Sequence, residues 1–399
     1  MRRRSPARTW PFFAGNALSA IGTWFQLIAQ SILVYELTGS VTLVGVVNFA
    51  QSAATLVLGP VAGVAADRRD RRGLLVRSQL LSAGLIFALA IADAVDAASV
   101  PLVVGVALGV GACNTYAFPI VLAMAPQAAT PGREDGAVNK TIMTFSLARA
   151  IGPVLGAVVV RWLGTPSAFA LNGLSYLALA AGALAVPRVE LLSFADTTDT
   201  SFRTSLRRLS QDRLLVAMIV AAGTLSMAID PVATLSPAIA VDVLGRDAAL
   251  SGTMLGAFGF GALLGGAVLA RFAPISDQWL LASLLGAASF VMAYATSASF
   301  MAILVLLVLA GIGFIVAMTT LMSRLQRAVP ASEHGRLMAV WSVAVAWRTV
   351  ASLVDGAVAD GIGFAAGAAV VVAPAVAASL FLRSALRGRR VVLAGGRRS

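Results

Sequence analysis

The chain has 399 residues, of which 59% are hydrophobic and only 12% charged, and its formal net charge is +12. The mean hydropathy is +0.88. A soluble domain of this composition would expose apolar patches larger than soluble monomers tolerate, so the composition excludes an ordinary soluble protein. The single cysteine and single histidine exclude a disulfide framework and a Cys/His metal cluster, and we expect neither a metal site nor a cofactor.

Twelve apolar stretches are long enough to cross a membrane, since a hydrocarbon core of about 30 Å requires about 20 residues of helix. They are long and continuous, unlike the alternating segments of about ten residues that form transmembrane strands. We therefore predict an all-α membrane protein with twelve transmembrane helices in two six-helix bundles. The expected spans are 10–37, 42–66, 74–95, 100–126, 137–161, 166–187, 214–240, 248–272, 279–297, 300–323, 337–359 and 364–383.

The basic residues predict the orientation of these spans. If the N-terminus lies inside the cell, only four of the 30 Lys and Arg residues fall outside cytoplasmic segments: Arg149, Arg161, Arg246 and Arg348. This asymmetry follows the positive-inside rule and predicts both termini in the cytoplasm. No loop is long enough to form a nucleic-acid-binding module, so we expect the charge to reflect membrane topology and not a nucleic-acid partner.

A polar stretch at 188–213 separates six expected spans from six others. We predict an N-terminal bundle over 1–187, a cytoplasmic linker over 188–213, and a C-terminal bundle with a basic tail over 214–399. The linker is either solvated or an amphipathic helix on the inner membrane surface.

The two halves also repeat in sequence. Residues 127–136 align without gaps on 326–335, and the same offset of 199 places Arg149 on Arg348 and Gly164 on Gly363. A weaker echo joins 36–39 to 242–245. Duplicated halves with both ends inside are typical of transporters built from parallel repeats.

Several motifs carry a resemblance to a known family. A charge-dense turn, Gly63-Val-Ala-Ala-Asp67-Arg68-Arg-Asp-Arg71-Arg72, lies between the second and third spans. Further matching segments are 34–40, 59–72, 148–156 and 171–176 in the first half, and 243–245 and 329–336 in the second. With these motifs the chain resembles the major facilitator superfamily, in particular its branch of enterobactin-type siderophore exporters and macrolide efflux pumps.

The resemblance implies a role for the charged turn. In the resembled fold it faces the N-terminus of helix 11, where the helix dipole favours a carboxylate by about 0.3–1 kcal/mol. Gly63, one turn before Asp67, permits close helix approach. We hypothesise that Asp67, with Arg68, Arg71 and Arg72, latches the cytoplasmic side of the transporter. The alternative is that the arginines only set the topology.

The expected fifth span contains Gly152, Pro153 and Gly156, which resemble the antiporter signature of the superfamily. Glycine permits tight packing, and proline removes a backbone donor and bends the helix. The resemblance associates this bend with exporters. Ala148 stands where the signature usually has glycine.

Four charged residues are expected well inside spans, away from the span ends: Arg149, Asp230, Arg348 and Asp355. An isolated charge at the centre of a bilayer costs at least about 2.5–3.5 kcal/mol, so each should meet a partner, water or ligand. In one interpretation the arginines pair with the aspartates and only lock the bundle. In the other, Asp230 or Asp355 binds and releases protons and so couples cargo movement to the proton gradient.

The resemblance places the cargo pocket between the halves, on helices 1, 4, 7 and 10. Methionine and aromatic side chains with a few polar groups suit amphipathic cargo. Any one of these residues can instead serve packing alone. The candidate lining residues are Asn16, Thr23, Trp24, Gln26, Gln30, Asn114, Tyr116, Met227, Met318, Thr319 and Met322.

These patterns predict a secondary active transporter in a bacterial plasma membrane, acting as a monomer on small-molecule cargo. We expect proton-coupled export of an amphipathic antibiotic, drug or siderophore by alternating access. An importer or facilitator, or a non-transporting receptor or sensor with the same fold, is the alternative. The sequence contains no P-loop pattern and no arrangement of nucleophile, base or metal ligands, so an ATP-driven pump and an enzyme are not expected.

Overall fold

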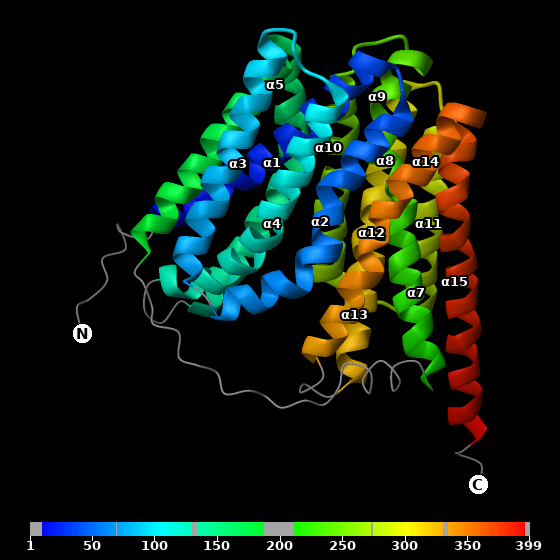
Figure 1. The fold of residues 1–399 in the computed structure, drawn as a ribbon. Coiled ribbons are helices and arrows are strands. Elements are labelled where there is room, and N and C mark those ends of the chain that lie inside the picture. Colours follow the sequence, from blue (N-terminus) through cyan, green and yellow to red (C-terminus); the bar gives the residue numbers. More distant parts are fainter. Residues whose placement is uncertain are drawn as a thin grey trace, which may run out of the picture. The chain divides into compact units, whose positions relative to one another are not determined.

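A computed structural model describes residues 10–68, 70–129, 134–186, 211–272, 274–329 and 334–395 of the chain. Every regular element in these ranges is a helix (Figure 1). Contacts between Cα atoms divide the chain into two units, Met1–Ala195 with Ala240–Gly256, and Asp196–Ile239 with Ala257–Ser399. Residues 240–256 group with the first unit, and the bundle boundaries inferred from the sequence remain a proposal. Most of the predicted linker, 188–213, lies outside the described residues.

The first unit is built from five long helices: α1 (Trp10–Thr38), α2 (Val41–Arg68), α3 (Arg71–Ala94), α4 (Val100–Ala128) and α5 (Glu134–Ala185). α1 and α3 pack along α5, and α2 packs along α4. Small residues allow these helices to approach closely, as expected in lipid. A Cβ atom built on Gly111 of α4 would lie 1.9 Å from the Gln51 carbonyl oxygen of α2. Glycine at 111 is therefore required by the α2–α4 contact.

The second unit begins with α7 (Arg213–Ala228), followed by the short α8 (Pro231–Thr234) and α9 (Ser236–Ala238). A π-helical turn, η2 (Ile239–Val243), and α10 (Leu250–Phe272) run across the division between the units. The remaining helices are α11 (Asp277–Ala295), α12 (Phe300–Ala328), α13 (His334–Ala346), α14 (Arg348–Ile362) and α15 (Phe364–Gly395). α7 packs against α13 and α15, and α11 packs against α12 and α15.

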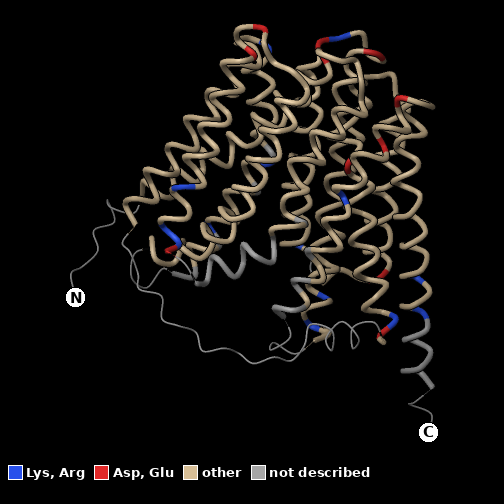
Figure 2. Tube along the Cα trace, in the orientation of Figure 1, with Lys and Arg blue, Asp and Glu red and all other residues tan. Residues whose placement is uncertain are grey.

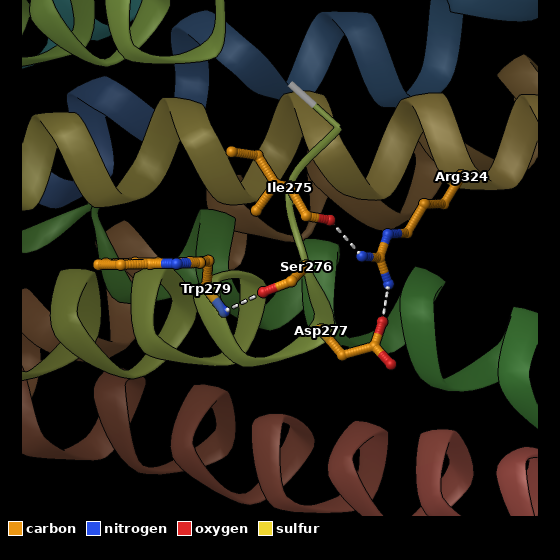
Figure 3. Close-up of polar contacts among 5 residues, drawn as sticks. All are labelled: Ile275, Ser276, Asp277, Trp279 and Arg324. Carbon is orange, nitrogen blue, oxygen red and sulfur yellow. Dashed lines mark hydrogen bonds and ion pairs between the residues drawn. The ribbon is translucent and has the colours of Figure 1, made fainter. Parts of the chain in front are cut away.

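One arginine joins two helix ends in the second unit (Figure 3). Arg324, in the last two turns of α12, donates from Nη1 to Asp277 Oδ1 over 2.6 Å and from Nη2 to the Ile275 carbonyl over 2.7 Å. Asp277 lies in the first turn of α11, where the helix dipole also favours its charge. The Ser276 hydroxyl caps the same turn by accepting from the Trp279 backbone N–H over 3.4 Å. Arg324 thus fixes the start of α11 on the end of α12.

Helix breaks recur at equivalent places in the two halves. α5 is interrupted at Gly164 (φ 79°), and α14 ends at Gly363 (φ 121°), 199 residues later. Gly39 (φ 64°) after α1 and Gly245 (φ 60°) after η2 form a second pair. Left-handed backbone of this kind favours glycine, because other residues place Cβ too close to the backbone. The helix breaks therefore occur at positions that the sequence repeat predicts to be equivalent in the two halves.

Nine helical segments of the described chain are long and apolar enough to cross a membrane. They match the predicted spans 10–37, 74–95, 100–126, 166–187, 214–240, 248–272, 279–297, 300–323 and 364–383. Helices also occupy 42–66, 137–161 and 337–359. That these three segments cross the membrane stays a prediction. The charged residues gather mainly at helix ends, and few lie along the helices (Figure 2). The all-α, multi-pass membrane fold is confirmed.

Candidate functional site

The first unit contains a cavity of about 180 Å³ between α1, α3, α4 and α5, here called the first-unit cavity. Its polar side chains are Asn16, Ser19, Thr23, Gln79 and Asn114. Its apolar wall is made of Ala20, Ala117, Phe118, Val121, Phe145 and Leu179. Residues 16, 19, 20 and 23 share one face of α1, because their spacing follows the helical period. The cavity is open on one side and offers hydrogen-bonding groups along α1, α3 and α4.

Three residues predicted to line a cargo pocket lie in this cavity: Asn16, Thr23 and Asn114. Gln79 on α3 was not predicted, although it is 1% exposed and its Oε1 has no hydrogen-bond partner among the described residues. Phe145 on α5 was not predicted either. No short-range sequence signal places α3 or α5 beside α1.

Gln26 and Gln30 belong instead to a buried hydrogen-bond network between α1 and α5. Gln26 Oε1 accepts from Asn172 Nδ2 over 2.9 Å and from the Tyr176 hydroxyl over 3.2 Å. Gln26 Nε2 donates to Gln30 Oε1 over 3.1 Å. The Ser175 hydroxyl contacts Asn172 Oδ1 at 3.0 Å. The network explains the polar residues of the segment 171–176. This segment was among those that carry the family resemblance, but no role was predicted for it.

The remaining predicted cargo residues do not line the first-unit cavity. Trp24 packs against Gly152, and Tyr116 packs on the hydrophobic cluster around Ile120 and Met124. In the second unit, Met227 on α7 is half-buried. On α12, Met318 and Met322 are half-buried and Thr319 is exposed.

The second unit contains a buried acidic site on the broken seventh span. α7 ends at Ala228, and Pro231 and Pro237 start the short helices α8 and α9, since proline lacks the N–H that continues a helix. Asp230 lies in this break and is 6% exposed. Its Oδ2 accepts from the Thr234 hydroxyl over 3.1 Å, and its Oδ1 lies 3.9 Å from Arg348 Nε.

Asp355 lies on α14, seven residues after Arg348, and is completely buried. Its two carboxylate oxygens have no hydrogen-bond partner among the described residues. It is close enough to Asp230 and to Tyr294 of α11 to interact with both electrostatically. Buried groups of this kind are normally hydrogen-bonded, so an unpartnered buried carboxyl group is unusual.

Hydroxyl groups complete the acidic site. The fully buried Tyr294 and Ser236 of α9 share a hydrogen bond of 2.8 Å, and Ser236 also donates to the Val232 carbonyl. The Arg348 side chain is 46% exposed and that of Asp230 only 7%, so the ion pair joins a buried acid to a partly exposed base. Thr234, Ser236 and Tyr294 were not predicted. The two closely spaced prolines were the available signal, because they free backbone and side-chain groups inside an apolar span.

Arg149 is half-buried on α5 and has an interaction partner in the structure. The ion pair described for Asp230 is with Arg348, so one of the predicted arginine–aspartate pairs is present.

The charged turn is only partly described. α2 extends to Arg68, but the side chains of Asp67 and Arg68 and the surroundings of Gly63 lie outside the described part, so the proposed latch stays a prediction. Arg71 begins α3 and Asp70 caps it, accepting from the Gly73 backbone N–H over 3.1 Å. Arg72 Nη1 donates to the Val186 carbonyl over 3.2 Å, which joins the start of α3 to the end of α5.

The predicted bend of α5 is packed on two sides by glycine contacts. On one side, Cβ atoms built on Gly152 and Gly156 would lie 2.7 Å from Trp24 Cβ and 3.1 Å from Phe25 Cα of α1. On the other side, a Cβ built on Gly252 of α10 would lie 2.5 Å from the Pro153 carbonyl oxygen. The Gly-Pro segment therefore provides close contact surfaces for both α1 and the first turns of α10.

Comparisons with known proteins agree with this architecture. A family model described as "Transmembrane secretion effector" matches residues 8–393. A staphyloferrin A transporter of Staphylococcus aureus is 24% identical over 167 residues, a region that covers 41% of this chain and only 42% of that relative.

Two solved transporters share the fold at low sequence identity. A bacterial homologue of the human lysosomal transporter Spinster, in an inward-facing and occupied conformation, aligns with a TM-score of 0.76 and 13% identity over 95% of this chain and 96% of that one. A D-xylose–proton symporter aligns with a TM-score of 0.69 and 17% identity, over 95% and 97% of the chains. The family and these relatives are transporters and not enzymes. The chain belongs to the transmembrane secretion effector family of the major facilitator superfamily.

Proposed function

We propose that this membrane transporter exports an amphipathic small molecule in exchange for protons. It works in a bacterial plasma membrane with both termini in the cytoplasm, as the distribution of arginines predicts. The observation that carries the proposal is the completely buried Asp355, whose carboxylate oxygens have no hydrogen-bond partner among the described residues.

A buried carboxyl group without a partner is tolerated far better when it is protonated, because burial disfavours the charged form. Asp230, close to Asp355, has Arg348 and Thr234 as partners and can carry a charge at lower cost. The two aspartates thus differ in environment, and one proton more or less at this site changes whether Arg348 meets one negative charge or two. Such a change gives proton binding a mechanical consequence at the junction of α8 and α14.

A purely structural ion pair accounts for only part of this site. It explains Asp230, which lies 3.9 Å from the Arg348 Nε atom. It does not explain Asp355, since a buried acid without a partner destabilises the fold. A residue that lowers stability in this way is expected where binding or coupling requires it.

The cargo class is supported by the family and by the staphyloferrin A transporter, 42% of which aligns with this chain. The family description refers to secretion, and the relative is named for transport of staphyloferrin A. The Gly-Pro segment of α5, which packs against α1 and α10, resembles the antiporter signature of the superfamily. We therefore propose a siderophore or antibiotic as the exported molecule. The charged turn at 63–72 serves as a latch in this proposal, and its test is substitution of Asp67 by alanine.

The decisive experiment measures accumulation of radiolabelled staphyloferrin A and of labelled erythromycin in inside-out vesicles. A pH gradient with the interior acidic is imposed, and a sodium gradient of equal size is imposed separately. We expect accumulation only with the pH gradient. Asp355→Asn should abolish this accumulation but preserve cargo exchange between equal concentrations, which requires no proton movement.

Asp360→Asn is the matched control, because Asp360 is exposed on the same helix, α14. Its accumulation should equal that of the unchanged protein. Coupling that survives in both Asp355→Asn and Asp230→Asn would exclude the acidic site as the coupling site. Accumulation in right-side-out vesicles alone would identify an importer, and binding without accumulation in either orientation would identify a receptor.

A further inference from the structure

We propose that the first-unit cavity binds an uncharged ring that carries hydrogen-bonding groups, and that this ring is one part of the cargo. The inference rests on the proposed transport function for its biological meaning. The physical basis of the inference does not depend on transport. It consists of the size, the walls and the polar groups of a cavity within one unit.

The volume of the cavity sets the size of the group that fits. An engineered protein cavity of about 150 Å³ lined by apolar side chains binds benzene. The first-unit cavity, at about 180 Å³, therefore accommodates a single six-membered ring with one small substituent. It is too small for a complete drug-sized molecule, whose pockets usually measure about 300–1,000 Å³. A subsite for one part of a larger cargo is the role that this volume allows.

The polar lining determines the charge of the group. Asn16, Ser19, Thr23, Gln79 and Asn114 offer amide and hydroxyl groups, and none of the described lining residues is acidic or basic. A carboxylate or ammonium group entering this cavity would lose its hydration without gaining a counter-charge, which is strongly unfavourable. The lining thus selects an uncharged ring and rejects ionised groups.

One polar atom in the wall is unsatisfied. Gln79 Oε1 is buried and has no hydrogen-bond partner among the described residues, although Gln79 is only 1% exposed. A buried acceptor that is left without a donor has lost its hydration without compensation, which is unfavourable. Because this oxygen exposes less than 1 Å² of surface, a ligand N–H or O–H group reaches it only when the Gln79 side chain turns toward the cavity. That contact removes the unfavourable state of the acceptor, so the ring should carry a hydrogen-bond donor.

Two aromatic side chains form one part of the cavity wall. The rings of Phe118 on α4 and Phe145 on α5 lie 5.0 Å apart between centroids, tilted by 56°. Phe118 lines the cavity and is 51% exposed, so the pair is not enclosed on all sides. Aromatic faces and edges in this wall favour a flat ring, through offset-stacked or edge-to-face contacts.

Benzamide and benzoate form a matched pair of probes for this proposal. They share one ring and nearly one shape, but benzamide is uncharged with an N–H donor, whereas benzoate is an anion. Binding to the purified full-length protein in detergent is measured by saturation-transfer NMR, with empty micelles as the blank. We expect benzamide to bind at least about tenfold more tightly than benzoate.

Two variants locate the binding in the first-unit cavity. Gln79→Leu keeps the side-chain volume but removes the acceptor, and it should weaken benzamide binding about fivefold. Ala117→Phe fills the cavity and should abolish binding. If Ala117→Phe does not fold, Ala20→Leu fills the same cavity from α1. Thr144→Val is the control, because Thr144 lies outside the lining and its hydroxyl bonds to the Lys140 carbonyl; it should leave the affinity unchanged.

Equal binding of benzamide and benzoate would overturn the proposal, as would benzamide binding that persists in the cavity-filled variant. Failure of benzamide to bind the unchanged protein would overturn it equally. These measurements use no transport and no gradient, so they can fail while proton-driven export succeeds. Conversely, selective binding that depends on Gln79 would stand even if the transport direction proved to be inward.

Discussion

Tyr35 and Asp242, which are 207 residues apart in the sequence, are joined by a hydrogen bond in which the Tyr35 hydroxyl donates to Asp242 Oδ2 over 2.5 Å. Tyr35 lies in the last turn of α1 and is 6% exposed, whereas Asp242 is exposed in the π-helical turn η2. Each residue precedes a glycine with positive φ, Gly39 and Gly245, within the repeated turn. The bond therefore connects the ends of the first spans of the two sequence repeats.

The first prediction concerns this bond. Tyr35→Phe removes the donor and leaves an exposed carboxylate that water can solvate, so the loss should be small, about 1 kcal/mol. We expect hydrogen exchange of the backbone amides at 239–245 to become several-fold faster, while exchange in α4 stays unchanged. Tyr116→Phe is the control and should alter neither. Unchanged exchange at 239–245 would show that η2 is held by its backbone alone.

The second prediction concerns the stability cost of the acidic site. Asp355→Leu replaces a buried, unpartnered carboxyl group by an apolar side chain of similar shape, which should stabilise the protein by about 1–3 kcal/mol. Asp230→Leu should instead destabilise it, because it removes the partner of Thr234 and Arg348. The measurement is the melting temperature in detergent. A lower melting temperature for Asp355→Leu would indicate that water or an ion occupies the site.

The sequence predicted features that depend on local chemistry. Apolar length predicted the helices, and the offset of 199 placed Gly164 and Gly363 in equivalent positions, which both proved to be helix breaks with positive φ. Asp230 and Arg348 were predicted as possible partners because isolated charges are expensive in a membrane. These predictions need only the properties of one segment and its neighbours in the chain.

Features that depend on long-range packing were beyond the sequence. Asn16, Thr23, Gln26 and Gln30 form one continuous polar stripe on α1, and the sequence assigned all four to cargo binding. The structure divides the stripe, because α5 places Asn172 and Tyr176 opposite Gln26 and leaves the cavity opposite Asn16 and Thr23. Helical periodicity shows which residues share a face, but only the packed neighbour determines what that face meets.

The third prediction separates these two parts of the stripe. Gln26→Leu leaves the Asn172 amide, the Tyr176 hydroxyl and Gln30 Oε1 without a partner in a buried region. Each such group costs about 1–3 kcal/mol, so the melting temperature should fall by about 5 °C or more. Gln278→Leu, at an exposed position of α11, is the control and should have little effect.

A double-mutant cycle can contradict this prediction. Asn172→Leu removes one of the orphaned groups, so the loss in Gln26→Leu/Asn172→Leu should be clearly smaller than the sum of the two single losses. Additive losses would mean that Gln26 acts outside the network, which would return it to the candidate cargo residues.

The fourth prediction tests the contact between α5 and α10. A Cβ atom at position 252 would lie 2.3 Å from Ala157 Cβ and 2.5 Å from the Pro153 carbonyl oxygen, which is closer than real Cβ contacts. Gly252→Ala must therefore separate the two helices, and we expect it to destabilise the protein by about 1–3 kcal/mol. Gly266→Ala on the same helix has open space and should be neutral or slightly stabilising, by up to about 1 kcal/mol.

Gly252→Ala and Gly266→Ala also test whether the contact between α5 and α10 matters for transport. If the Gly-Pro segment of α5 must stay in close contact with α10 during export, Gly252→Ala should slow gradient-driven accumulation several-fold at a temperature where both variants remain folded. Gly266→Ala should transport at the rate of the unchanged protein, because it adds a methyl group without displacing a neighbour. Equal melting temperatures and equal rates for the two variants would show that α5 and α10 do not approach this closely in the working protein. A fall in stability without a fall in rate would confine the role of Gly252 to packing and separate the Gly-Pro segment of α5 from the export mechanism.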